Sequence, residues 1–197
     1  MGNLGLPNLI TLSRLLTIPF ISYFYFTGRT QWAFLALTYA GFSDLIDGGL
    51  ARLMGQRTKL GAILDPAADK ALMLVCFTTL AIMKQVPVWF AVLVVVRDVY
   101  IVVGVIILKY RHKRVYIRPT YVSKMTTFFQ LSLLFAVFAF SYLETTSYSW
   151  TPSALSFFAT GVRVGFYLAV AFTLASGIHY TLVGWALFRG KDHEGVL

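Results

Sequence analysis

Six long runs of apolar residues follow one another along the chain, separated by short polar stretches. They cover residues 9–26, 31–53, 60–83, 87–108, 123–143 and 161–188. Each run is close to or above the roughly 20 residues that a helix needs to cross the hydrocarbon core of a bilayer. We therefore expect an all-α membrane protein, a bundle of six transmembrane helices that forms a single domain over residues 1–197.

The basic residues are distributed unequally between the ends of these runs. The connections after the first and third runs carry only Arg29 and Lys84. Many more basic residues follow the second, fourth and sixth runs, namely Arg52, Arg57, Lys59, Lys109, Arg111, Lys113, Arg114, Arg118, Lys124, Arg189 and Lys191. Positive charge accumulates on the cytoplasmic side of membrane proteins. The pattern therefore predicts that both termini face the cytoplasm.

The composition supports a membrane protein and narrows its partners. Hydrophobic residues make up 58% of the chain and charged residues only 13%. The net charge of +9 lies mainly in the connections, which favours topology and anionic lipid over a nucleic-acid partner. The single cysteine, Cys76, excludes an internal disulfide, and we expect it to have a packing role.

Four of the eight acidic residues lie inside the second and third apolar runs: Asp44, Asp47, Asp65 and Asp69. A carboxylate inside a membrane costs several kcal/mol, so such residues indicate a functional site. Their i,i+3 and i,i+4 spacings place each pair on one face of its helix. The short connection at 54–59 makes the two helices antiparallel neighbours, and the four carboxylates are predicted to converge near its cytoplasmic side.

Four neighbouring carboxylates repel one another unless a cation neutralises them, and an oxygen-only ligand set favours Mg²⁺, Mn²⁺ or Ca²⁺. Four ligands suffice for two ions, an arrangement suited to displacement at phosphorus. Small residues at Gly48, Ala51 and Gly61 leave room for a ligand beside the helix backbones, and Arg52 offers a fork for phosphate oxygens. The residues together predict a pocket for a metal-bound diphosphate.

Three other interpretations account for part of this pattern. The acids, Arg52 and the glycines are also what buried ion pairs and tight helix packing require. A divalent cation transporter would line its path with carboxylates, but it would not need Arg52 or the glycine spacing, and the outer halves of these runs lack matching polar residues. A lipid-binding scaffold would tolerate the loss of a catalytic base.

The spacing of these residues is similar to the signature of the CDP-alcohol phosphatidyltransferase family. Asp44 to Arg52 form the pattern Asp-x-x-Asp-Gly-x-x-Ala-Arg, and after eight residues Gly61 to Asp69 form Gly-x-x-x-Asp-x-x-x-Asp. The resemblance implies six helices, a homodimer and two Mg²⁺ or Mn²⁺ ions held by the four aspartates, with Asp69 also the general base. It further implies a CDP-diacylglycerol donor whose CDP moiety is bound by Gly48, Ala51, Arg52 and Gly61.

The acceptor is less clearly indicated. The Asp65 to Lys70 segment resembles the cardiolipin synthase and phosphatidylglycerophosphate synthase branches, whose acceptors are phosphatidylglycerol and glycerol 3-phosphate. Arg97 followed by Asp98 favours the first branch, whereas Met125 to Thr127 departs from it. The acceptor site is predicted at a basic cluster formed by Arg111, Arg114, Arg118 and Lys124. Without an evident transit peptide, we expect a bacterial inner membrane and an active site facing the cytoplasm.

Overall fold

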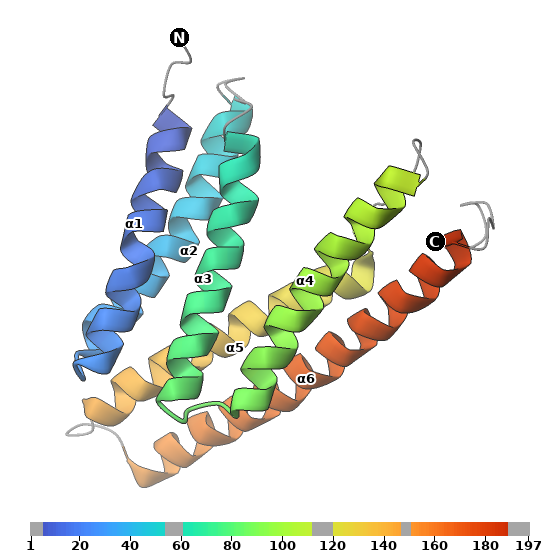
Figure 1. Cartoon of the computed structure of the whole chain (residues 1–197). Helices are drawn as coiled ribbons and strands as arrows, with labels where there is room; N and C mark the ends of the chain where they lie inside the picture. The colour runs from blue at the N-terminus through green and yellow to red at the C-terminus, as the bar shows by residue number, and fades with distance from the viewer. Residues whose placement is uncertain (1–5, 54–60, 112–119, 147–150, 189–197) are drawn as a thin grey trace.

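The computed structural model describes residues 6–53, 61–111, 120–146 and 151–188, and all regular structure in these ranges is helical. Figure 1 shows the helices α1 (Leu6–Phe26), α2 (Thr30–Leu53), α3 (Gly61–Ile82), α4 (Val88–Arg111), α5 (Tyr121–Thr145) and α6 (Pro152–Phe188). Each apolar run corresponds to one helix. The prediction of an all-α protein is therefore confirmed for the described residues.

The largest difference from the predicted bounds lies at the start of α6. This helix has 37 residues and begins at Pro152, well before the predicted start at 161. The Thr151 hydroxyl accepts a hydrogen bond from the Ala154 N–H at 3.3 Å, and proline is favoured at the first helical position. At 1.5 Å per residue the helix is about 55 Å long, which exceeds the roughly 30 Å of a hydrocarbon core.

Within the described residues, four helices are long and apolar enough to cross a membrane, over Leu9–Phe26, Val88–Ile107, Tyr121–Thr145 and Pro152–Trp185. Large apolar side chains on their outer surfaces are exposed, among them Leu16, Val96 and Leu182. Such surfaces are stable when lipid covers them. The helices α2 and α3, which carry the four aspartates, have 24 and 22 residues, and their membrane crossing remains a prediction.

The helices form two groups that separate towards one end of the bundle (Figure 1). In the first group, α1 packs against both α2 and α3, and in the second α6 packs against α4 and α5. At the lower end of the view, α3 is followed by α4, which joins the two groups (Figure 1). The Phe90 ring of α4 packs against the rings of Phe77 in α3 and Phe166 in α6, with centroids 5.5 and 5.1 Å apart. Towards the upper end, α3 and α4 diverge.

The signature residues lie at the end where the bundle opens. Helix α2 ends there and α3 begins there, in antiparallel directions, as the short connection between them predicts (Figure 1). The start of α1 and the end of α6 lie at this same end, which agrees with an even number of helices. Their location on the cytoplasmic side of a membrane remains a prediction.

Candidate active site

Two of the four predicted metal ligands, Asp65 and Asp69, lie in the first half of α3 and bond to α1. The Thr11 hydroxyl donates to Asp65 Oδ1 at 2.9 Å, and Arg14 Nη1 donates to Asp69 Oδ1 at 3.1 Å. Thr11 and Arg14 are three residues apart on α1, so they share the helix face that turns towards α3. Helix α1 therefore holds both carboxylates in position.

Arg14 also connects α3 with α2. Its Nε donates to the Ser43 hydroxyl at 3.2 Å, while that hydroxyl donates to the Ala40 carbonyl at 2.8 Å. Ser43 immediately precedes Asp44, the first residue of the signature. The Arg14 guanidinium thus connects Ser43, which directly precedes the first acidic pair, with Asp69, the last residue of the second pair. Its planar fork makes a fixed geometry possible.

The two partners in this ion pair differ in exposure. The side chain of Arg14 is fully buried, whereas that of Asp69 is 52% exposed. A buried guanidinium is costly to desolvate unless ionic and hydrogen-bonding partners compensate for the lost water. The arrangement fixes Asp69 from the protein side and presents its carboxylate to the space between the helices, as a group that acts on a substrate requires.

The remaining signature residues can be placed only by their backbone. Asp44, Asp47, Gly48, Ala51 and Arg52 belong to the last turns of α2, but their side chains lie outside the described part of the structure. Gly61 is the buried first residue of α3. The convergence of four carboxylates and the CDP pocket therefore remain predictions.

The described donors fit a hard divalent cation. Asp65 is half-buried and Asp69 is half-exposed, and both offer carboxylate oxygen, the ligand type that Mg²⁺ and Mn²⁺ prefer. Hydrogen bonds from Thr11 and Arg14 orient these carboxylates, in the manner in which neighbouring donors commonly orient metal ligands.

Thr11 and Arg14 were not identified from the sequence as site residues. For Arg14 a signal was present, because it is an ionisable residue in the middle of an apolar run, the same criterion that identified the four aspartates. Thr11 carried no comparable signal. A hydroxyl within an apolar helix commonly bonds to its own backbone, so its role depends on which face of α1 meets α3.

The predicted acceptor cluster is only partly described. Arg111 is the last residue of α4, and its side chain lies outside the described part. Arg114 and Arg118 lie outside it altogether. Lys124 is exposed in the first turn of α5. The gathering of these four residues into one site stays a prediction.

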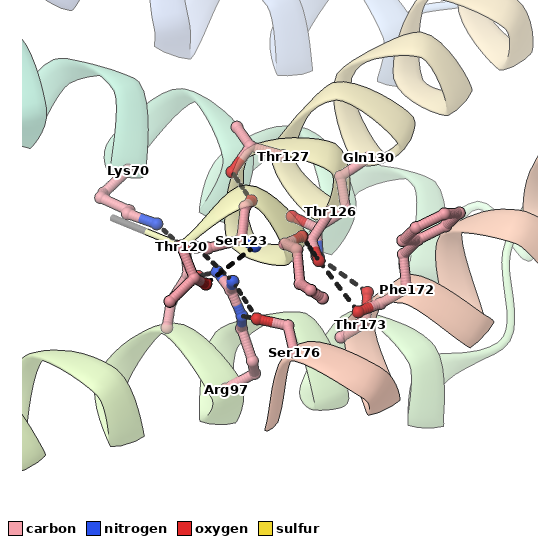
Figure 2. Close-up of polar contacts among 12 residues, drawn as sticks. Lys70, Arg97, Thr120, Ser123, Thr126, Thr127, Gln130, Phe172, Thr173 and Ser176 are labelled. Carbon is pink, nitrogen blue, oxygen red and sulfur yellow. Dashed lines mark hydrogen bonds and ion pairs between the residues drawn. The ribbon is translucent and has the colours of Figure 1, made fainter. Parts of the chain in front are cut away.

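A second polar cluster lies between the helices of the other group (Figure 2). Arg97 of α4 reaches Ser123 of α5 through Nη2 at 2.8 Å and Ser176 of α6 through Nε at 3.2 Å. Arg97 Nη1 also donates to Asp98 at 2.8 Å, and Asp98 forms an ion pair with Lys70 of α3. The cluster therefore spans four helices and ends at the residue next to Asp69.

Two cavities flank α3 at this level. One of ≈ 470 Å³ lies between α2, α3 and α5, and its lining is apolar except for Asp69 and Thr127. The other, of ≈ 260 Å³, lies between α3 and α4, where Lys70 and Asp98 are its polar residues. Met73 contributes to both walls. The carboxylate of Asp69 thus adjoins space that apolar groups can fill.

Several proteins that are similar to this chain in sequence are described as cardiolipin synthases (CMP-forming). A fission yeast (Schizosaccharomyces pombe) cardiolipin synthase (CMP-forming) / mitochondrial hydrolase fusion protein is 35% identical to this chain over 193 aligned residues. The alignment covers 90% of this chain and 30% of that protein. The human cardiolipin synthase (CMP-forming) is 28% identical over 79% of this chain and 61% of its own length. The Streptomyces coelicolor cardiolipin synthase (CMP-forming) is 33% identical over 64% of this chain and 60% of its own length.

The chain thus spans less than two thirds of the length of each of these relatives. The model of the CDP-alcohol phosphatidyltransferase family matches residues 4–175, a range that includes α1 to α5, most of α6 and every residue of the signature. With the apolar helices, this match indicates an integral membrane protein. The chain belongs to the CDP-alcohol phosphatidyltransferase family.

Proposed function

We propose that the protein transfers the phosphatidyl group of CDP-diacylglycerol to phosphatidylglycerol, forming cardiolipin and releasing CMP. The observation that carries the proposal is the Asp69 carboxylate, held by buried Arg14 and exposed beside an apolar cavity. The names of the relatives support phosphatidylglycerol as the acceptor. Glycerol 3-phosphate, the other acceptor considered from the sequence, has no such support.

In the proposed reaction, the terminal hydroxyl of the phosphatidylglycerol headgroup attacks the phosphorus that carries diacylglycerol. A new phosphorus–oxygen ester bond forms, and the bond between this phosphorus and the phosphoanhydride oxygen breaks, so that CMP leaves. Asp69 accepts the hydroxyl proton as general base. The exposure of its carboxylate allows an acceptor to approach, and the bond from Arg14 keeps the carboxylate oriented.

Members of this family generally use divalent metal ions. We assign the ligands to Asp44, Asp47, Asp65 and Asp69, with two Mg²⁺ or Mn²⁺ ions, which when bound supply positive charge to the diphosphate and the departing CMP. Asp65 is suited to this role because Thr11 fixes its carboxylate. Gly48, Ala51, Arg52 and Gly61 are assigned to the CDP moiety, and Arg111, Arg114, Arg118 and Lys124 to the anionic acceptor.

We also propose that the active site faces the cytoplasm, that the host membrane is a bacterial inner membrane and that the protein is a homodimer. The first assignment is supported by the basic connections near the signature end. The second depends on the sequence alone, since similar proteins occur in a yeast, in humans and in a bacterium. The dimer depends on the family resemblance.

Product identification tests the reaction and the acceptor together. Purified protein in mixed micelles would receive CDP-diacylglycerol and Mg²⁺ or Mn²⁺, with phosphatidylglycerol in one sample and glycerol 3-phosphate in another. We expect CMP and cardiolipin in the first sample only. Phosphatidylglycerophosphate in the second sample, without cardiolipin in the first, would overturn the acceptor, and no CMP in either would overturn the reaction.

Chelation provides the matching test of the metal. Addition of EDTA should stop CMP release, and excess Mg²⁺ or Mn²⁺ should restore it. Unchanged release in EDTA would overturn the metal assignment. A cation transporter would instead move the ion across liposomes without CDP-diacylglycerol, and the same protein in liposomes distinguishes these outcomes.

A further inference from the structure

We propose that Lys70 binds the phosphodiester of phosphatidylglycerol and that the cavity between α3 and α4 takes one of its acyl chains. This inference depends on the proposed function, since it describes where the acceptor of that reaction binds. It assigns the acceptor lipid to a place on α3 that the basic cluster predicted from the sequence does not include.

Lys70 is held in a way that allows it to exchange partners. Its side chain is 51% exposed, and its ammonium group pairs with Asp98, whose side chain is 12% exposed. Asp98 also accepts a hydrogen bond from Arg97, which Ser123 and Ser176 fix on the opposite side. When Lys70 turns to another anion, Asp98 therefore retains a cationic partner and is not left as a buried, unpaired charge.

The position of Lys70 beside Asp69 matches the headgroup of the acceptor. Consecutive Cα atoms are about 3.8 Å apart. In phosphatidylglycerol, three carbon atoms separate the phosphodiester oxygen from the terminal hydroxyl. The Lys70 and Asp69 side chains leave α3 from adjacent positions and diverge. The glycerol of a phosphodiester bound by the Lys70 ammonium has to bridge them to bring its terminal hydroxyl to the carboxylate that is proposed to take its proton. Glycerol 3-phosphate lacks acyl chains and would use only the polar part of this site.

The cavity that Lys70 lines combines charged and apolar residues, as a binding site for an amphipathic lipid does. Its charged residues, Lys70 and Asp98, are accompanied by Met73 and Leu74 of α3 and by five valines of α4. An amphipathic ligand with an anionic headgroup places its charge at the ammonium and its chain against the apolar wall. This charge complementarity favours an anionic phospholipid over an apolar segment of another protein.

The second cavity explains why two lipid substrates can be bound together. It lies between α2, α3 and α5, on the side of α3 that carries Asp69, and it adjoins the signature helix α2. The donor, whose CDP moiety is assigned to α2, extends its diacylglycerol towards this side. The α3/α4 cavity is then the separate place that the acceptor's chain requires.

Kinetic constants of matched variants test the inference. Lys70→Met removes the charge and keeps the stem, Lys70→Arg keeps the charge, and Val99→Trp fills the cavity. Val96→Trp is the control, because Val96 is exposed on α4 and does not line the cavity. We expect Lys70→Met and Val99→Trp to raise the KM for phosphatidylglycerol about 10-fold or more. The KM for CDP-diacylglycerol should be unchanged, and Lys70→Arg and Val96→Trp should resemble the wild type.

A crosslinking measurement keeps the test independent of turnover and folding yield. Wild-type protein would be illuminated with phosphatidylglycerol that carries a diazirine on one acyl chain, and adducts would be located by mass spectrometry. Adducts on α4 between Val94 and Val103 are expected, whereas labelled CDP-diacylglycerol should mark Phe42, Leu131 or Phe135. Phosphatidylglycerol adducts confined to this second set, or an unchanged KM in Lys70→Met and Val99→Trp, would overturn the inference while cardiolipin formation persists. If the wild type forms no cardiolipin, the proposed function fails as well.

Discussion

The two helix groups each contain a buried arginine bonded to an aspartate, but the two pairs are built differently. Arg14 and Asp69 come from different helices, and the aspartate side chain is 52% exposed. Arg97 and Asp98 are consecutive on α4, with side chains 5% and 12% exposed. The same two residue types therefore leave one carboxylate accessible and the other enclosed.

This difference indicates different roles for the two pairs. Arg97 bonds to serines of α5 and α6, and Asp98 bonds to Lys70 of α3, so the enclosed pair holds four helices together. Arg14 contributes two of its bonds to Ser43 and Asp69, which adjoin or belong to the signature. The Arg14–Asp69 pair, whose carboxylate is accessible, is therefore suited to chemistry, and the enclosed Arg97–Asp98 pair to stability. Mutations can test this division.

The largest expected effect is on catalysis, from Asp69→Asn. Loss of the proposed base should reduce the rate of CMP release per folded molecule by about 10²–10⁴-fold. Asp98→Asn is the matched control and should retain activity within about 10-fold, since it removes no group assigned to proton transfer. Equal CMP release by Asp69→Asn and the wild type would contradict the assignment.

A large effect on stability is expected from Arg97→Met. Asp98, Ser123 and Ser176 would lose their shared donor, and breaking a buried ion pair costs about 3–5 kcal/mol. Thermal unfolding in detergent should show a clear decrease in Tm, while CMP release per folded molecule should change little. A loss of turnover without a decrease in Tm would show that the enclosed pair serves the reaction.

Arg14→Lys should have a smaller effect, on turnover. A lysine keeps the positive charge but lacks the fork that joins Ser43 to Asp69. Loss of a group that orients a metal ligand typically costs about 10–100-fold, so we expect kcat to decrease by this amount with little change in KM. Arg29→Lys, at an exposed position of the turn after α1, is the control. Identical kcat values for both variants would argue against orientation by Arg14.

The smallest effect is expected from Thr11→Val. The substitution removes the hydrogen bond to Asp65 and keeps a similar shape, at a cost of about 1 kcal/mol. We expect an increase of several-fold in the Mg²⁺ or Mn²⁺ concentration needed for half-maximal activity, measured by metal titration. Thr17→Val, which loses only a bond to the Ser13 carbonyl of its own helix, should leave this concentration unchanged.

The sequence predicted the helices well because apolar runs of membrane length have few other uses. The predicted start of α6 was wrong because it was inferred from hydropathy alone, although Thr151 and Pro152 form a recognisable helix start. The aspartates were identified by the cost of charge in a membrane, and Arg14 satisfied the same criterion. Its partners could not be predicted, because they depend on how α1 is rotated against α2 and α3.

The other cluster shows the same limit. Arg97 and Asp98 are visible in the sequence as neighbouring charges, but their remaining partners come from α3, α5 and α6. Residues 26, 28 and 79 positions apart meet there only after the helices pack, and no local sequence pattern predicts the contact between Arg97 and Ser176. The cavities on either side of α3 likewise arise from the divergence of helices and not from any single segment.

The bond between Arg14 and Asp69 also bears on how the protein is made. Moving an unpaired carboxylate into the bilayer costs free energy, and a cationic side chain already in the bilayer lowers that cost by pairing with it. Arg14 precedes Asp69 by 55 positions, so α1 is synthesised well before α3 leaves the ribosome. Where α3 is inserted beside α1, Arg14 lowers the free-energy cost of moving the Asp69 carboxylate into the bilayer.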